Sequence, residues 1–127
     1  MQLQFIGCGD AFGSGGRFNT CFHVTGESTN FLIDCGASSL IAMKQLGISH
    51  NQIDVILFTH FHADHFGGLP FLMLDAQFFT KRTTPLTIAG PAGLKEWYVR
   101  VMETAFPGSS GTKQKFPLNM IELKPDV

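Results

Sequence analysis

Residues 59–65, Thr59-His60-Phe61-His62-Ala63-Asp64-His65, gather three imidazoles and one carboxylate into six positions, His60 to His65. A neutral imidazole binds borderline metals through a ring nitrogen, and a carboxylate adds a harder oxygen ligand. The alternative is a solvated polar turn that is rich in histidine by chance. The whole chain contains only 5 His, so three of them at this spacing favour a metal site.

The flanking sequence predicts that this segment is a loop between two buried elements. The run from Ile53 to Phe58 is apolar and rich in β-branched residues, which is typical of a strand buried on both faces. Gly67-Gly68 permits a tight turn. Leu69-Pro70 then opens an apolar stretch over 71–79 that is predicted to be a helix with Pro in its first turn. The candidate ligands therefore follow the carboxyl end of a buried strand, where open α/β sheets usually place their sites.

The spacing of the four candidate ligands indicates two metal positions. His60 and His62 are two residues apart and can point the same way from an extended segment. Asp64 and His65 come after a turn and can face a second position. Two adjacent divalent metals would then share the loop. In two-metal hydrolases a bridging water becomes hydroxide near neutral pH and attacks an electrophilic carbon or phosphorus.

On these residues the chain resembles the metallo-β-lactamase superfamily, whose signature is the His-x-His-x-Asp-His loop. The resemblance implies that His60 and His62 bind one zinc, and that Asp64 and His65 bind a second. Asp34, which follows the predicted strand ending at Ile33, matches an earlier aspartate of the family that supports the metal loop from behind. Two catalytic roles are open for Asp64: a plain metal ligand, or a group that also accepts a proton from the attacking water. Manganese and iron are alternatives to zinc.

The ribonuclease Z branch of that superfamily, the tRNA 3′-end endonucleases, matches three further segments. These are residues 5–10 (FIGCGD), 64–70 (DHFGGLP) and 85–94 (PLTIAGPAGL). The family's αββα sandwich implies an α/β chain with a mixed sheet and flanking helices. The implied activity is metal-dependent hydrolysis of phosphodiesters by a metal-activated hydroxide. Esters, lactones, thioesters and sulfate esters are alternative substrates, because the fold hosts many chemistries.

The second part of the family's ligand set has no counterpart in this sequence. Family members carry a further His for each zinc and a bridging Asp, whereas no His follows His65 here. A catalytic zinc normally has three protein ligands and an open position. We therefore expect residues 1–127 to be a single domain that forms the N-terminal half of a larger hydrolase. The alternatives are a homo-oligomer that completes the site and a non-catalytic half-domain that binds a partner.

Composition bears on partners and compartment. Only 15% of the residues are charged, below the usual quarter for soluble domains, so apolar surface is expected to meet the missing half or another subunit. The net charge of −1 predicts no broad basic face, so an RNA substrate is open but not indicated by charge. Lys81-Arg82 is expected to be a solvated loop cluster. No run reaches the ~18 apolar residues of a membrane span.

Three cysteines, Cys8, Cys21 and Cys35, lack the spacing of a disulfide framework or a zinc ribbon. They are predicted to be small buried thiols in strands, and a cytoplasmic protein is expected. Of the two other histidines, His23 is predicted to be a packed or surface residue of a strand, and His50 a solvated turn residue.

The remaining pattern predicts alternating strands and helices around a glycine-rich loop at 7–19. That loop is expected to form a rim of the active site or to be a plain connection. Further strands are expected at 2–6, 20–25, 29–33, 86–89 and 119–123, and helices at 38–46, capped by Ser38, and at 91–105. In the last helix Trp97 and Tyr98 belong to an apolar stripe that is typical of core packing.

Overall fold

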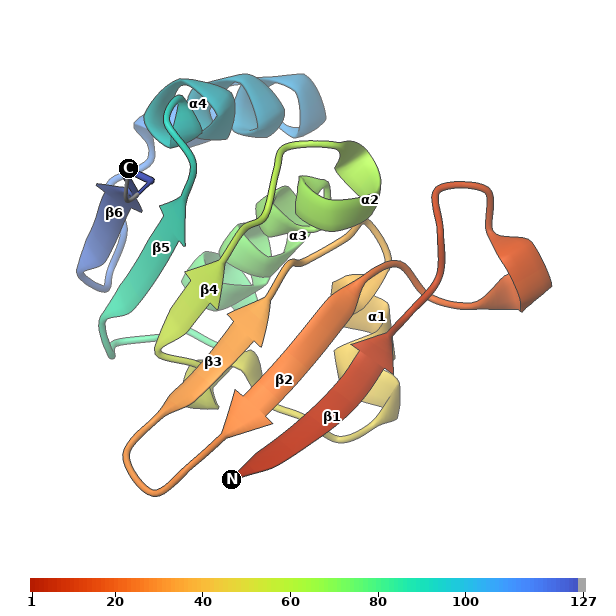
Figure 1. The fold of residues 1–127 in the computed structure, drawn as a ribbon. Helices are drawn as coiled ribbons and strands as arrows, with labels where there is room; N and C mark the ends of the chain where they lie inside the picture. The colour runs from red at the N-terminus through yellow and green to blue at the C-terminus, as the bar shows by residue number, and fades with distance from the viewer. Residues whose placement is uncertain (126–127) are drawn as a thin grey trace.

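Six strands form one mixed sheet in a computed structural model that describes residues 1–125 (Figure 1). In the order of the chain and of the sheet, the strands are β1 (Gln2–Gly7), β2 (Cys21–Thr25), β3 (Asn30–Ile33), β4 (Val55–Leu57), β5 (Leu86–Gly90) and β6 (Leu118–Glu122). Strands β1 to β3 pair antiparallel, and β3 to β6 pair parallel. The parallel half places the carboxyl ends of β3, β4 and β5 at one edge, where the candidate metal loop begins.

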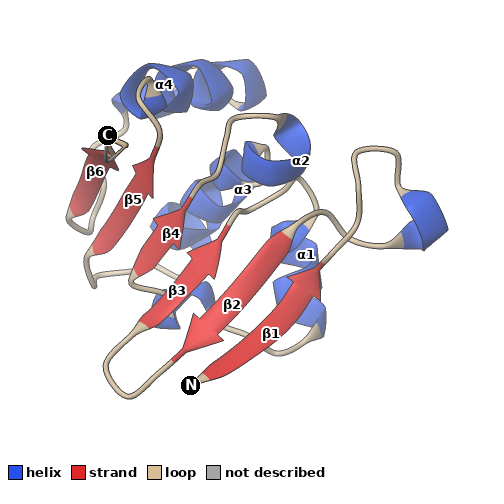
Figure 2. Cartoon of the chain, in the orientation of Figure 1, coloured by secondary structure: helices blue, strands red, loops and turns tan. Residues whose placement is uncertain are grey.

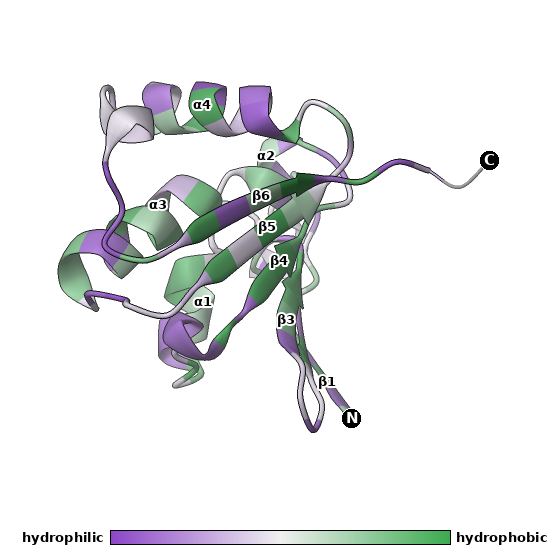
Figure 3. Ribbon diagram, turned by 90° about the vertical axis from the view of Figure 1, so that its left-hand side faces the viewer, coloured by the Kyte–Doolittle hydropathy of each residue, from purple (hydrophilic) through white to green (hydrophobic). Residues whose placement is uncertain are grey.

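The helices gather on one face of this sheet. They are α1 (Ser39–Gln45), α2 (Ala63–Phe66), α3 (Leu69–Leu74), which continues into a π-helical turn (Asp75–Phe79), and α4 (Leu94–Ala105). Figure 2 shows the helices as connections between the parallel strands, and Figure 3 shows α1, α3 and α4 side by side on the same side of the sheet. Within residues 1–125, none of the helices has the length and apolar character needed to cross a bilayer.

The hydrophobic core lies between the sheet and these helices. Leu32, Ile56 and Ile88, at the centres of three adjacent parallel strands, are fully buried and pack in one cluster with Met43 of α1 and Leu72 of α3. Because strand side chains alternate between faces, one residue in two of each strand supplies this core. A core of this kind fixes the sheet and thereby the loops at its carboxyl edge.

No helix among the described residues covers the opposite face of the sheet (Figure 3). Leu3 and Phe5 of β1 are 59% and 62% exposed, and Ile121 of β6 is 49% exposed. The described residues thus form one sheet and one helical layer. The predicted α/β class with a mixed sheet and flanking helices is confirmed.

Several element boundaries differ from the predictions for identifiable reasons. The expected helix over 71–79 is an α-helix up to Leu74 and a π-helical turn after it. Ser38 makes no capping hydrogen bond to α1, because its Oγ accepts instead from the backbone N–H of Asn19 (2.8 Å). Helix α4 begins at Leu94 rather than Pro91, after Gly93 in a left-handed conformation (φ 95°).

Two predictions about polar residues were wrong. His50 is buried rather than solvated, and its Nε2 lies 2.9 Å from Oδ1 of Asp75. Arg82 is also buried, because its guanidinium donates to four backbone carbonyls that the loops around it would otherwise leave unpaired, those of His50, Ile53, Thr84 and Pro85. Both errors concern side chains with partners 25 to 32 residues away in the sequence, in addition to two nearby acceptors of Arg82.

Candidate metal centre

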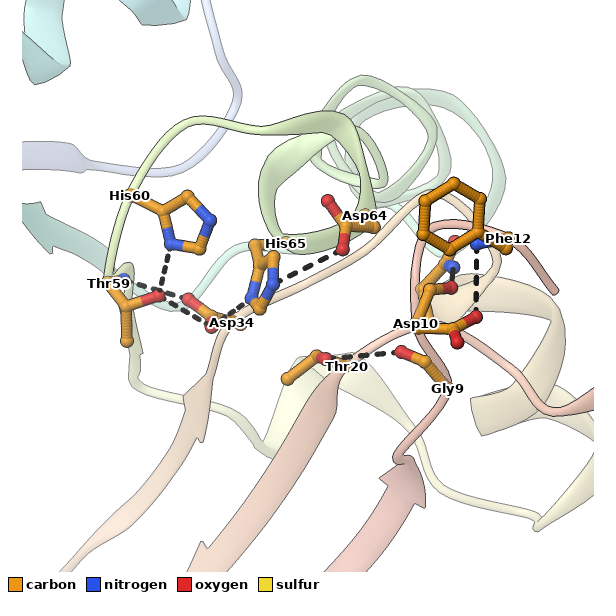
Figure 4. A network of polar contacts seen from close by, with 10 residues as sticks. Gly9, Asp10, Phe12, Thr20, Asp34, Thr59, His60, Asp64 and His65 are labelled. Carbon is orange, nitrogen blue, oxygen red and sulfur yellow. Dashed lines mark hydrogen bonds and ion pairs between the residues drawn. The ribbon is translucent and has the colours of Figure 1, made fainter. Parts of the chain in front are cut away.

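The segment from the end of β4 through α2 holds the four predicted ligands at the carboxyl edge of the sheet. Figure 4 shows three of them, His60, Asp64 and His65. His60 and His62 lie in the extended part of the loop, whereas Asp64 and His65 lie in the single turn of α2. The ring of His60 lies 4.8 Å from that of His62 and 4.1 Å from that of His65, centroid to centroid. The structure therefore brings all four residues into one cluster.

Asp34 anchors this cluster from beneath. Its carboxylate accepts hydrogen bonds from the backbone N–H of Thr59 (2.8 Å), the hydroxyl of Thr59 (2.8 Å) and Nδ1 of His65 (2.7 Å). The residue is only 2% exposed and adopts a left-handed backbone conformation, with φ 62°. A non-glycine residue in that region is uncommon and costs free energy, which is typical of sites where function fixes the geometry.

Two glycines allow the segment after β3 to pack directly against α2. A Cβ on Gly36 would lie 2.2 Å from the carbonyl oxygen of Asp64, and a Cβ on Gly68 would lie 2.1 Å from the carbonyl oxygen of Gly36. The backbone N–H of Cys35 also donates to the carbonyl of His65 (2.7 Å). These contacts hold Asp34 at a fixed height beneath the histidines, and any side chain at either glycine would push the two segments apart.

The hydrogen-bond pattern sets the tautomers of two histidines. Since a carboxylate only accepts, Nδ1 of His65 carries the proton that Asp34 receives. The hydroxyl proton of Thr59 also goes to Asp34, so the Oγ1 of Thr59 accepts from Nδ1 of His60, 2.9 Å away. In the neutral imidazole, both rings therefore have an unprotonated Nε2, which is the form that binds a metal, and both are oriented through one buried carboxylate.

The donors that result fit a divalent cation in their chemistry. Nε2 of His65 lies 3.3 Å from Oδ2 of Asp64, so an imidazole nitrogen and a carboxylate oxygen lie side by side. Such a pair favours a cation that both groups can bind. Within residues 1–125, however, no three His, Cys, Asp or Glu side chains are arranged to hold a metal ion by themselves. The cluster supplies oriented donors but not a closed coordination shell.

A cleft of about 430 Å³ opens between this cluster and the glycine-rich loop. Its lining residues are Ala11, Asn19, Ala37, His62, Ala63 and Asp64. The loop is ordered by Asp10, whose carboxylate accepts from the hydroxyl and backbone N–H of Ser14 and from the backbone N–H of Phe12. The hydrogen bonds from Ser14 lower the pKa of Asp10. The glycine-rich loop thus forms one wall of a cleft whose other wall is the predicted metal loop.

The cysteines do not extend the donor set. Burial raises the pKa of Cys21 to about 12 and that of Cys35 well above its ordinary value, so both are thiols rather than the thiolates that bind metals. Cys8 is exposed, in contrast to the prediction that all three are buried, because it lies after β1 at the start of the glycine-rich loop. His23 is buried in β2, as one of the two expected states, with its Nε2 2.6 Å from Oδ1 of Asn30.

Sequence reasoning did not identify the role of Thr59. Its position directly before the first histidine was visible, but its function depends on contact with Asp34, 25 residues away. The same holds for Asp10 and Asn19, which shape the cleft wall through contacts inside a loop that has no regular period.

Comparison with known proteins agrees with this geometry. A family model described as anti-Pycsar protein Apyc1 matches residues 1–114. Ribonuclease Z of Agathobacter rectalis is 42% identical over 107 residues, which cover 84% of this chain and 33% of that protein. Ribonuclease Z of Clostridium kluyveri is 45% identical over 94 residues, which cover 74% and 31%. The chain spans about a third of the length of these curated relatives.

Solved structures give the same result at the level of the fold. The short form of human tRNase Z superposes with a TM-score of 0.80 and 30% identity, over 99% of this chain and 47% of that one. The metallo-β-lactamase fold protein YhfI from Bacillus subtilis superposes with a TM-score of 0.70 and 21% identity, over 98% and 47%. The chain therefore belongs to the family described as anti-Pycsar protein Apyc1, and it is a ribonuclease Z-like member of the metallo-β-lactamase superfamily.

Proposed function

We propose that this chain supplies the N-terminal half of a metal-dependent hydrolase that cleaves phosphodiester bonds in a ribonuclease Z-like manner. The observation that carries the proposal is a hydrogen-bond relay with two branches, both of which start at Asp34. One branch runs directly to His65, and the other runs through Thr59 to His60. These contacts fix two imidazoles as electron-pair donors beside His62 and Asp64, which line an open cleft. A purely structural polar turn would not need two histidines oriented by one buried carboxylate.

Within this proposal His60 and His62 hold one divalent metal ion, and Asp64 and His65 hold a second. Zinc suits the imidazole-rich set, and manganese or iron would accept the same donors. When bound, such ions supply Lewis acidity that acidifies water and stabilises developing negative charge. Asp34 does not bind a metal in this scheme, because its oxygens already accept from Thr59 and His65.

Asp64 is the residue proposed to act on the attacking water. Its side chain is 18% exposed and lines the cleft beside His62, so solvent and substrate can both reach it. A carboxylate there can accept a hydrogen bond from water and then its proton as the water attacks phosphorus. His65, which Asp34 holds in place, lies next to Asp64 on α2. Its ring limits the directions in which the Asp64 carboxylate can turn.

The substrate class rests on the named relatives, which are ribonucleases Z and a tRNase Z. RNA is therefore the proposed natural substrate, although the net charge of −1 provides no broad basic surface on this part of the protein. Other esters, lactones, thioesters and sulfate esters are the competing substrate class. A phosphodiester is preferred because two adjacent metals can stabilise both the attacking and the leaving oxygen.

In this proposal the metal site is completed by donors from outside residues 1–125. Two exposed apolar surfaces could bind the part of the protein, or the second copy, that supplies them. We propose that residues 1–127 form one domain half whose open sheet face packs against the second half of the sandwich. We also propose a homo-oligomer through a helical patch, defined here as Ile41, Leu46, Phe71, Phe78 and Phe79, which are 46–75% exposed.

The three free cysteines are consistent with a reducing compartment, so a cytoplasmic protein is proposed.

The test combines metal content with hydrolysis. Purified protein should contain about two divalent ions per active site and cleave bis(p-nitrophenyl) phosphate, and a chelator should abolish the activity until zinc is returned. His60→Ala and His65→Ala should each lower metal content and reduce turnover by about a hundredfold or more.

Lys95→Ala, at an exposed position of α4, is the matched surface control and should behave like wild type. Hydrolysis that survives the chelator, or full metal content in both histidine variants, would contradict the proposal. An assembled, metal-free protein without hydrolytic activity would instead favour the non-catalytic half-domain that binds a partner.

A further inference from the structure

A second hollow, of about 180 Å³, lies between the metal loop and α4. Figures 1 and 3 both show α4 beside the segment that leads into α2. The lining is mostly apolar and aromatic, with polar groups from α4, and includes Phe61, Phe66, Trp97, Arg100, Val101 and Thr104. Pockets that combine an apolar wall with a few polar groups are the usual form of small-molecule sites. We call this hollow the Trp97 pocket.

Aromatic rings form one side of the Trp97 pocket. Phe61 and Trp97 are stacked, with ring centroids 5.9 Å apart and planes 21° apart. Phe61 in turn makes an edge-to-face contact with the buried Phe66, at 5.1 Å. Trp97 is 42% exposed although it is the largest apolar side chain of α4. A half-exposed indole that a second ring holds in place offers a rigid surface on which a planar ring can stack.

A cation lies over the face of Trp97 and must move aside when another ring stacks there. The guanidinium of Arg100 lies 5.1 Å from the ring centroid of Trp97. It forms an ion pair with Glu96, and the Arg100 side chain is 57% exposed. The guanidinium therefore reaches solvent and can exchange Glu96 for another anion. An arginine beside an aromatic face suits a ligand that joins a flat ring to a phosphate.

The Trp97 pocket adjoins the proposed catalytic cleft. Ala63 lines both hollows. Phe61, which forms the wall of the pocket, stands between His60 and His62 in the sequence. In an extended segment neighbouring side chains point to opposite sides, so the loop carries its metal ligands on one side and the pocket wall on the other. One extended ligand could therefore reach from the cleft past Ala63 into the pocket.

We propose that the Trp97 pocket binds the base of a nucleotide, which stacks on Trp97 while its phosphate faces Arg100. The ligand class rests on the proposed function, in which the substrate is a polymer of nucleotides. Base stacking on an aromatic side chain tolerates any base, because every base has a π-face. The pocket would thus act as a subsite for a nucleotide that flanks the bond cleaved in the adjoining cleft.

The chain contains a single tryptophan, so its fluorescence reports on this pocket directly. Titration of metal-free protein with AMP should quench and shift the emission of Trp97 in a saturable manner. Adenosine should give the same spectral change at about tenfold higher concentration, because it lacks the charge-assisted contact to Arg100. Inorganic phosphate alone should leave the emission unchanged, because it offers no ring to stack.

Three substitutions on α4 sharpen the test. Arg100→Gln should weaken AMP binding about tenfold and leave adenosine binding unchanged. Glu96→Gln should tighten AMP binding, because it removes the anion that competes for the guanidinium. Val99→Ala, 47% exposed and outside the pocket lining, is the matched control and should bind AMP like wild type.

Equal quenching by phosphate and AMP would overturn the base-stacking assignment, as would an unchanged emission at millimolar AMP. So would a change in Trp97 emission that follows protein concentration instead of nucleotide, since the pocket would then hold a side chain of a second copy. Failure of the proposed function is distinguishable, because it would appear as absent hydrolysis while AMP still bound. Hydrolysis by a protein whose Trp97 emission does not respond to AMP would contradict the nucleotide subsite but not the proposed function.

Discussion

At the scale of single residues, the site depends on a buried aspartate that contacts the ligand loop from behind. Asp34 is buried, accepts three hydrogen bonds and sits in a left-handed backbone conformation directly after β3. Its two oxygens set the proton positions of His65 directly and of His60 through Thr59. One carboxylate therefore orients two imidazoles as electron-pair donors beside the cleft.

Asp34→Asn should keep the backbone and damage the relay, because asparagine tolerates the left-handed region but presents an N–H₂ group to donors. We expect zinc affinity to fall by about 10–100-fold and the free energy of unfolding to fall by about 1–3 kcal/mol. Isothermal titration calorimetry and urea unfolding measure the two quantities.

Asp34→Ala is the companion variant. It also loses the hydrogen bonds to the carboxylate and adds backbone strain in the left-handed region, so it should be less stable than Asp34→Asn. Zinc affinity equal to wild type in Asp34→Asn would show that the relay does not orient the ligands.

At the scale of elements, a buried polar junction ties three segments together at the end of the sheet away from the cleft. Asp75 begins the π-helical turn after α3 and contacts Lys44 of α1 (2.6 Å) and His50 in the turn before β4 (2.9 Å). Burial raises the pKa of Asp75, but the hydrogen bonds and positive charges of Lys44 and His50 outweigh it, so the pKa is lowered overall.

This junction predicts a pH dependence of stability. A carboxyl whose pKa is lower in the folded state stabilises the fold above its unfolded pKa of about 3.9, and the contribution is lost as pH falls through the folded pKa. Asp75→Asn should therefore cost about 1–3 kcal/mol at neutral pH, at the lower end because Lys44 is half exposed. The gap to wild type should close below about pH 4.

Urea unfolding at a series of pH values measures this gap. Glu27→Gln, at an exposed turn position, should follow wild type throughout. A gap between wild type and Asp75→Asn that stays constant down to low pH would show that charge does not underlie the contribution of Asp75.

At the scale of the whole molecule, two apolar surfaces stay open in the described chain. One is the sheet face with Leu3, Phe5 and Ile121, and the other is the helical patch formed by α1, α3 and the π-helical turn. They lie on opposite sides of the sheet, so the second half of the sandwich and a second copy of the chain could bind at the same time. The proposed assembly would bury both surfaces and would thereby explain the low charge content.

Disruption of the helical patch should dissociate an oligomer. In a two-fold dimer each copy contributes the same patch, so Phe79→Asp removes two apolar contacts worth about 1.5–3 kcal/mol each when fully buried. We expect the dissociation constant to rise by at least about a hundredfold, as measured by sedimentation velocity over a range of protein concentrations.

Phe12→Ser is the matched control, because Phe12 is 90% exposed but lies in the glycine-rich loop. If Phe79→Asp left the association state unchanged, the helical patch would be excluded as the interface.

The sequence by itself determined the features that depend on local order. The period of apolar residues located the strands and helices, because side-chain direction follows from spacing within an element. The segment from His60 to His65 identified the candidate ligands, because four donors in six residues are close in space in any compact conformation. The sequence also showed that the later histidine ligands of the family have no counterpart here, since no His follows His65.

The tertiary structure alone decided what depends on distant contacts. The bond between Asp34 and His65 joins residues 31 apart, and the role of Thr59 exists only once that bond is made. The burial of Arg82 depends on carbonyls up to 32 residues away, and the stacking of Phe61 on Trp97 joins a loop to a later helix. Spacing within one segment carries no information about such pairs, because the whole sheet must form before their side chains meet.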